Sequence, residues 1–208
     1  MKKILLIGGF RFVRTSLRKL INTNKNLHVI EEHAGMSRTK SRKSPDIIIM
    51  DISIPSSDGI ETFLDTKQAY PKTPLLIVNG SEELDYASNY LRLGCNGYIS
   101  KKYGVEEIVE AIDVISNGIQ YVKPENLQKK ALNALSNRKI HDSLSKRELQ
   151  VFFKLVNGKS ILSVANDLNI STSTVSVFRS KILKKMHFKN NADLILYAKD
   201  QHCLTSLN

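Results

Sequence analysis

The chain has 208 residues, of which 41% are hydrophobic and 25% are charged, and both values are ordinary for a folded globular protein. Its two cysteines, Cys95 and Cys203, are too few and too far apart in sequence for a disulfide framework or a zinc site. The net charge of +11 is concentrated in the second half, because residues 144–208 hold ten basic and four acidic residues. This composition excludes a disordered or disulfide-stapled chain and favours a polyanionic partner.

The apolar segments are too short for a membrane protein. The longest, such as residues 47–50, have four or five residues, whereas a transmembrane helix needs about 20. Lys2 and Lys3 precede an apolar run, but the sequence GGFR at residues 8–11 ends that run too early for a signal peptide. We therefore expect a cytoplasmic protein that does not bind membranes.

Residues 1–122 alternate short apolar runs with longer amphipathic segments. We predict strands at residues 4–7, 27–30, 47–52, 75–78 and 97–100, and helices at residues 12–22, 59–69, 83–93 and 105–116. The alternation predicts a doubly wound α/β domain, in which helices cover both faces of a five-stranded parallel sheet. The basic cluster between the second and third strands, formed by Arg38, Lys40, Arg42 and Lys43, is interpreted as a solvated surface.

Two stretches imitate nucleotide-binding motifs. At Gly8 and Gly9 the dinucleotide fingerprint fails, because Phe10 and Val13 occupy the positions of its later glycines. The sequence NGKS at residues 157–160 ends like a P-loop, but Phe153 replaces the first glycine and the segment lies between two predicted helices. The sequence therefore predicts no nucleotide site.

A more specific pattern follows the third predicted strand. Asp51 stands at its carboxyl end, where ligands bind in open α/β sheets, and Pro55 and Asp58 follow in the turn to the next helix. Lys101 follows the fifth strand in the sequence GYISKK. With this order of motifs, residues 1–122 resemble a response-regulator receiver domain. The resemblance implies that Asp51 is the position phosphorylated by a histidine kinase and that Lys101 pairs with the phosphoryl group.

The sequence departs from the receiver pattern at two points. In that family the turn after the first strand carries two acidic Mg²⁺ ligands, whereas this chain has Gly8 and Gly9 there. Asn79 stands where the family has Thr or Ser, while Tyr98 keeps the aromatic switch position. We therefore expect weak or absent Mg²⁺ binding, no cofactor, and a degenerate receiver (a pseudo-receiver) that acts mainly in dimerisation, with Asp51 and Lys101 as a structural ion pair.

Residues 123–143 are polar and are predicted to form a linker, and residues 144–208 are predicted to be entirely helical. Ser145 and Glu148 fit a capping box at the first helix of this domain, and Gly158 fits its end. The stretch from residue 144 to 186 resembles the helix-turn-helix domain of the LuxR/FixJ type. Together with the receiver, this is the layout of the NarL/FixJ family, which implies a four-helix domain that binds double-stranded DNA.

The segment Thr172–Met186 is the candidate recognition helix. Val175, Phe178, Ile182 and Met186 recur at helical spacing and are expected to face the core. The opposite side carries the candidate DNA-binding residues Thr172, Ser173, Ser176, Val177, Ser180 and Lys184, with Arg179 and Lys181 on the flanks. This side offers few strong base contacts, so we expect Val177 to contact a thymine methyl group and the cations to contact phosphates.

Three hypotheses about function follow. The first is a transcription regulator that binds DNA as a homodimer without needing phosphorylation. The second is a conventional regulator that is switched by phosphorylation despite the missing acidic pair. The third is an auxiliary protein that forms a heterodimer with a partner regulator and binds DNA weakly. No enzymatic motif accompanies any of the five histidines.

Overall fold

A computed structural model describes residues 1–34, 44–53, 59–80, 84–123 and 139–201 of the chain. The chain forms two compact units, Met1–Lys130 and Ala131–Asn208. The sequence features expected at Pro55, Asp58, Cys203, the basic cluster of residues 38–43 and most of the linker lie outside the described residues. None of the described helices is long and apolar enough to cross a membrane.

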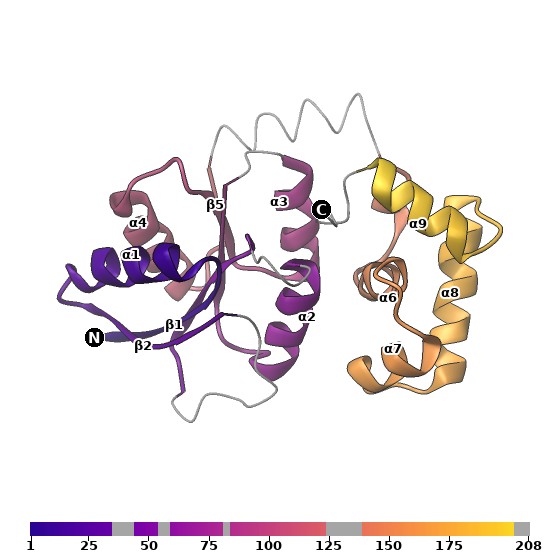
Figure 1. Cartoon of the computed structure of the whole chain (residues 1–208), viewed down its shortest axis with the longest axis horizontal. Helices are drawn as coiled ribbons and strands as arrows, with labels where there is room; N and C mark the ends of the chain where they lie inside the picture. Colours follow the sequence, from indigo (N-terminus) through magenta and orange to yellow (C-terminus); the bar gives the residue numbers. More distant parts are fainter. Residues whose placement is uncertain (35–43, 54–58, 81–83, 124–138, 202–208) are drawn as a thin grey trace. The chain divides into compact units, whose positions relative to one another are not determined.

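The first unit is built on a fully parallel sheet with the strand order β2-β1-β3-β4-β5-β6. The strands are β1 (Lys2–Gly8), β2 (Leu27–His33), β3 (Ile47–Asp51), β4 (Leu75–Asn79), β5 (Gly97–Ser100) and β6 (Tyr121–Val122). The helices are α1 (Arg11–Asn22), α2 (Gly59–Ala69), α3 (Leu84–Leu93) and α4 (Val105–Ser116). Figure 1 shows α1 and α4 on one face of the sheet and α2 and α3 on the other. The predicted doubly wound α/β fold is confirmed.

The sheet has six strands, so the prediction of five strands was wrong. After α4 the chain turns back through Gly118, whose φ of +78° is favourable for glycine. The Tyr121 amide then donates to the Asn96 carbonyl at 2.8 Å, and Tyr121 pairs with Gly97 of β5. A two-residue strand is too short to show any periodicity, and it forms only because β5 offers a free edge.

The core of this unit lies on both faces of the central strands, whose apolar residues are almost completely buried. On one face, Leu17 and Ile21 of α1 and Ile108 and Ile112 of α4 pack in one cluster with the sheet. Each such side chain contributes roughly 1.5–3 kcal/mol when it is buried. This packing on both faces makes the sheet a rigid support for its carboxyl edge.

Cys95 is buried and free, and its burial raises the pKa of the thiol to about 12.

Within residues 139–201, the second unit begins with a 3₁₀ turn, η1 (Ile140–Ser143). The helices α6 (Lys146–Val156), α7 (Ile161–Leu168), α8 (Thr172–Met186) and α9 (Asn191–Asp200) follow. The predicted capping box is confirmed: Ser145 Oγ accepts from the Glu148 amide and Glu148 Oε2 accepts from the Ser145 amide at 2.7 Å. Asn169 ends α7 in the left-handed region with φ of 51°, and Ser171 caps α8.

The core of the second unit is formed where α6 and α7 pack against α8 and against each other, while α9 packs against α6. Val175, Ile182 and Met186 of α8 are completely buried, and Phe178 is half-buried, as the helical spacing predicted. Phe152 and Phe153 of α6 pack edge to face with ring centroids 5.3 Å apart. Because one side of α8 is fixed in this core, its opposite side faces solvent.

Candidate functional site

The parallel strand register brings the receiver positions to one edge of the sheet. Gly8 at the end of β1 lies beside Asp51 at the end of β3. Asn79 at the end of β4 lies beside Ser100 at the end of β5, and the Lys101 amide donates to the Asn79 carbonyl at 2.7 Å. Residues that are far apart in sequence meet here because all carboxyl ends of parallel strands share one edge.

Asp51 is buried and has partners from its own strand end and from Lys101. Its side chain is 2% exposed, and its Oδ2 lies 2.7 Å from Lys101 Nζ. This contact is an ion pair whose geometry is not that of a hydrogen bond. Its Oδ1 accepts a hydrogen bond from the Ser53 amide at 2.9 Å. Lys101 also donates to Ser53 Oγ at 3.2 Å, so Ser53 connects the two charged groups.

The turn after β1 brings its backbone close to Asp51. Gly8 and Gly9 have φ values of +85° and +68°, a region that glycine adopts without strain. A Cβ atom at Gly9 would lie 2.2 Å from Asp51 Oδ2, which is far too short for a real contact. On α1, Arg14 Nη1 donates to the Gly9 carbonyl at 2.6 Å and to the Gly8 carbonyl at 3.2 Å. The glycine turn and Asp51 are therefore packed as a unit, and Arg14 fixes the turn.

This arrangement does not fit the Mg²⁺ ion that receiver domains use. Mg²⁺ needs a near-octahedral set of oxygen ligands at about 2.0–2.1 Å. The glycines supply no side chain, the Gly9 backbone leaves no room for one, and the carboxylate of Asp51 is already paired with Lys101. Throughout the described part of the chain, no three His, Cys, Asp or Glu side chains gather into a metal-binding group.

Asn79 and Tyr98 contact each other directly. Asn79 Nδ2 donates to the Tyr98 hydroxyl at 2.8 Å, and the Tyr98 side chain is buried against Tyr90 with ring centroids 6.4 Å apart. Tyr90 in turn packs edge to face on Phe63 of α2. The Asn79 amide thus holds the tyrosine ring inside the domain through a bond between two side chains.

In the second unit, the outer side of α8 is exposed along its length. The exposed residues include Thr172, Ser173, Ser176, Val177, Ser180, Lys181 and Lys184. Val177 is 53% exposed and is the apolar residue of α8 on this side. The Ser176 hydroxyl donates to the Thr172 carbonyl at 3.0 Å, so part of its hydrogen-bonding capacity is used within the helix. Small polar groups, one apolar group and two lysines therefore face solvent together.

Arg179 differs from the other candidate residues of α8. It is half-buried, and its Nε donates to Asn191 Oδ1 at the start of α9 at 2.7 Å. This bond directs the guanidinium towards α9. Arg179 thus connects the candidate recognition helix to the next helix.

The carboxyl half of α8 carries most of its cations. Lys181, Lys184 and Lys185 line a shallow hollow of about 520 Å³ together with Glu148 and His187. Lys185 is bound at 2.7 Å by Glu148 Oε2, which also takes part in the capping box of α6. Burial raises the pKa of Glu148, but the hydrogen bonds from Lys185 and Ser145 outweigh this effect and place the pKa below its ordinary value of 4.5.

Two family models match the chain. The response regulator receiver domain matches residues 4–113, and the luxR family of bacterial regulatory proteins matches residues 142–198. The chain belongs to the response regulators with a LuxR-type domain. The regulator is 28% identical over 204 residues to response regulator GacA of Pseudomonas aeruginosa, and the match covers 95% of each chain.

The regulator is also similar to the DNA-binding transcriptional activator EvgA of Escherichia coli K12. The two are 31% identical over 169 residues, which is 81% of this chain and 82% of EvgA. Among solved structures, RcsB from Salmonella enterica serovar Typhimurium, bound to promoter rprA in the presence of the phosphomimetic BeF3⁻, matches with a TM-score of 0.64. The match covers 99% of both chains at 19% identity, which shows a shared fold.

Three contacts at these sites were not predicted from the sequence. Ser53 joins Asp51 to Lys101, Arg14 holds the glycine turn, and Glu148 pairs with Lys185. Only Ser53 had a local signal, because it lies two residues after Asp51 on the same turn. Arg14 contacts Gly9, 5 residues away in sequence, and Glu148 contacts Lys185, 37 residues away. No periodic pattern in the sequence relates these partners.

Proposed function

We propose that this response regulator is a dimeric transcription factor that binds double-stranded DNA through the outer side of α8 without depending on Mg²⁺-assisted phosphorylation of Asp51. The observation that carries DNA binding is the exposed side of α8, where Lys181 and Lys184 lie beside small polar groups and Val177. A helix of this kind fits the major groove, with its amino-terminal half against base edges and cations against phosphates. The names of EvgA and of the RcsB–promoter complex are consistent with this role.

The receiver pocket supports the independence from phosphorylation. Asp51 is buried in an ion pair with Lys101, and the Gly9 backbone occupies the space beside Asp51 Oδ2. A phosphoryl group on Asp51 would have to displace these contacts with no metal ion to offset its charge. The bond from Asn79 to Tyr98 holds the buried ring in one position. We propose that the receiver contributes a fixed surface for dimerisation.

A conventional switch is the second candidate, and the retained pair of Asp51 and Lys101 is the observation that favours it. The two candidates differ in what Asp51→Asn does. In the proposed function, full-length Asp51→Asn protein dimerises and binds DNA like the wild type. This similarity persists after treatment of both proteins with Mg²⁺ and a small-molecule phosphoryl donor.

The measurement is a set of DNA-binding isotherms and sedimentation profiles for both proteins, with and without the donor. Circular dichroism confirms that Asp51→Asn is folded. A donor-dependent gain in affinity of the wild type, absent from Asp51→Asn, would establish the conventional switch instead.

A further inference from the structure

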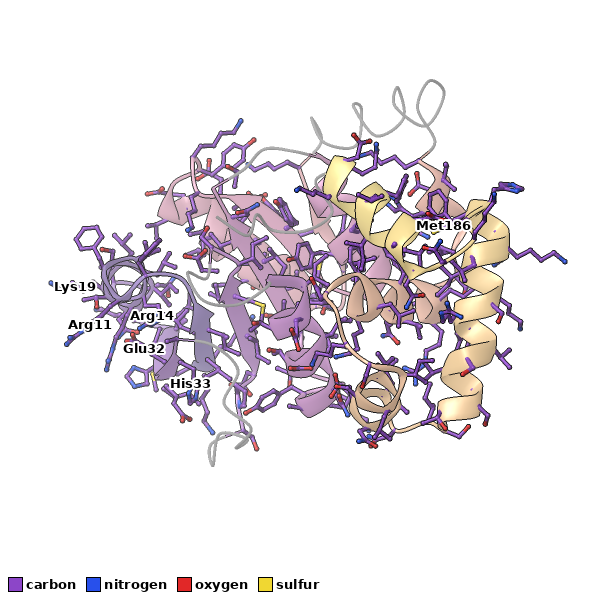
Figure 2. The ribbon with its side chains drawn as sticks, turned by 45° about the vertical axis from the view of Figure 1, so that its right-hand side comes forward. Arg11, Arg14, Lys19, Glu32, His33 and Met186 are labelled. Carbon is purple, nitrogen blue, oxygen red and sulfur yellow. The ribbon has the colours of Figure 1, made fainter. Side chains whose placement is uncertain are left out.

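The turn that ends α8 carries a histidine where its backbone favours glycine. α8 ends at Met186, which is labelled in Figure 2, and the exposed residue His187 follows with φ of 58° and ψ of 35°. The Phe188 amide donates to the Leu183 carbonyl at 2.9 Å, and the His187 amide donates to the Lys184 carbonyl at 3.3 Å. These two bonds form a Schellman motif, whose left-handed position is usually glycine because a Cβ atom is unfavourable there. The geometry of the turn therefore does not explain the histidine.

The imidazole of His187 is not used within the described part of the chain. Its ring forms no hydrogen bond or ion pair with any residue that the structure describes. By contrast, His141 is buried and lies 2.8 Å from the Tyr197 hydroxyl, and His33 lies 3.0 Å from a carboxylate oxygen of Glu31. A residue that keeps an unfavourable backbone conformation without a structural gain is a candidate for binding.

His187 lines a cationic hollow at the carboxyl end of α8. The hollow has a volume of about 520 Å³, and the other residues that line it are Glu148, Lys181, Lys184 and Lys185. Glu148 of α6 is bound to Lys185 at 2.7 Å, so these two charges compensate each other. Lys181 and Lys184 are exposed and form no ion pair with any of the described residues. The hollow therefore keeps two uncompensated positive charges beside the imidazole.

We propose that His187, in its protonated form, binds a DNA phosphate together with Lys181 and Lys184. The inference rests on the proposed binding of DNA through α8, and it adds a residue and a dependence on pH to that function. Lys181 and Lys184 belong both to the exposed side of α8 and to the hollow, so a phosphate group that they attract lies over the surface that His187 also lines. A protonated imidazole carries a positive charge and donates from both ring nitrogens, which suits a phosphate oxygen.

Protonation gives this contact a definite sign. Histidine is the side chain that changes its charge between about pH 5 and about pH 8, and a bound phosphate favours the charged form. DNA binding therefore takes up a proton, and affinity rises as the pH falls through this range. Lysine ammonium groups keep their charge at these pH values. Burial raises the pKa of Glu148, but the hydrogen bonds from Lys185 and Ser145 keep it below 4.5, so this carboxylate stays ionised.

The test compares full-length His187→Asn and His187→Lys with wild type. Asparagine tolerates the left-handed conformation but has no charge, whereas lysine is charged at every pH used. Between about pH 8 and about pH 5.5, wild-type affinity for duplex DNA should rise at least about threefold, and its salt slope should steepen by about one unit. His187→Asn should show neither change, and His187→Lys should bind at both pH values as wild type does at the lower one. Preferred and random duplexes should respond alike, because a phosphate carries no sequence information.

The matched control is His28→Asn, because His28 is exposed on β2 of the receiver and should not affect the response. Calorimetry in buffers with different ionisation enthalpies counts the protons taken up on DNA binding. Near neutral pH, His187→Asn should take up fewer protons than wild type, and His28→Asn should take up as many. Thermal melts at both pH values confirm that the variants are folded.

A wild-type affinity that does not change with pH would overturn the proposal, as would a change that His187→Asn retains in full. A response limited to the preferred duplex would also overturn it, because His187 would then contact a base. Absence of DNA binding at every pH would contradict the proposed function itself, whereas binding that is independent of pH contradicts only the role of His187.

Discussion

The carboxyl edge of the receiver sheet and the outer side of α8 both gather polar residues, but they use them differently. At the receiver edge, Asp51 is paired with Lys101, and Asn79 is bonded to Tyr98. On α8, Ser180, Lys181 and Lys184 are exposed. A polar group that is satisfied inside a fold must break that contact before it can bind anything else, whereas an exposed group exchanges only water. This difference supports the proposal that α8 binds the partner of the protein and that the receiver pocket stays closed.

The largest expected effect tests the closed pocket. Lys101→Met should destabilise the protein by about 3 kcal/mol, because it leaves the buried Asp51 carboxylate without its counter-charge. This value is the lower end of the range for a broken buried pair, since the Lys101 side chain is 27% exposed. Urea unfolding monitored by circular dichroism measures the change.

The matched control is the double variant Lys101→Met with Asp51→Asn, which should regain most of the lost stability because no buried charge remains. If Lys101→Met alone is as stable as wild type, the ion pair does not hold the pocket closed, and the contrast with α8 disappears.

The next effect concerns the exposed lysines of α8. Lys181→Ala and Lys184→Ala should each weaken binding to a preferred site and to random DNA by similar factors. Each should reduce the slope of log affinity against log salt by about one unit, as expected for one lost phosphate contact. Lys185→Ala should have a smaller effect, because Glu148 already holds its ammonium group. Binding isotherms at several salt concentrations measure the slopes.

Val177→Ala provides the contrast within the same helix. Loss of an apolar contact to a base should weaken binding to a preferred site by roughly 1 kcal/mol and leave random DNA unaffected. If the lysine variants and Val177→Ala all bind like wild type, α8 is not the DNA-binding helix, and the auxiliary-partner hypothesis becomes the better one.

A smaller effect concerns how pH acts on the helical unit. The pKa of Glu148 is lowered in the folded protein, so its stabilising contribution is complete above the ordinary value of 4.5 and is lost as the pH falls further. Asp167 pairs with Lys154 and Lys159 at 2.9 Å, and its pKa is lowered from the ordinary value of 3.8. Its contribution to the stability of the fold is therefore also lost as the pH falls. Glu148→Gln should reduce stability at neutral pH by about 1 kcal/mol and flatten its acid dependence. Thermal unfolding from roughly pH 3 to roughly pH 7, the range over which carboxylates titrate, measures both changes.

The smallest effect is expected from Mg²⁺. With no acidic pair beside Asp51, a few millimolar Mg²⁺ should stabilise the protein by less than about 0.3 kcal/mol, because stabilisation follows the ratio of ligand concentration to dissociation constant. Differential scanning calorimetry with Mg²⁺ and with matched ionic strength of NaCl measures this. If Mg²⁺ raises the melting temperature by several degrees and Asp51→Ala removes this rise, the pocket binds the metal ion. That result would contradict the proposed contrast between a closed receiver pocket and an exposed α8.

Local patterns in the sequence determined most of the secondary structure. Alternating apolar runs placed the strands of the sheet, and α2, α4 and α8 begin and end where the periodicity predicted. Ser145 and Glu148 indicated the start of α6 because a capping box acts within four residues. These features depend on neighbours in sequence, so they can be read without coordinates. The order of Asp51 and Lys101 along the chain also predicted their meeting, since parallel strands end at one edge.

Tertiary structure decided what these residues contact. The strand β6 exists because β5 has a free edge, and no pattern in two residues predicts it. The approach of Gly9 to Asp51, the bond from Asn79 to Tyr98 and the pair of Glu148 and Lys185 join segments 19 to 42 residues apart. Such contacts depend on strand register and helix packing, which fix side-chain directions to within a few ångströms. The sequence by itself therefore placed the candidate residues at the sheet edge and on one side of α8, and the packing of the folded chain determined which of them contact other residues and which face solvent.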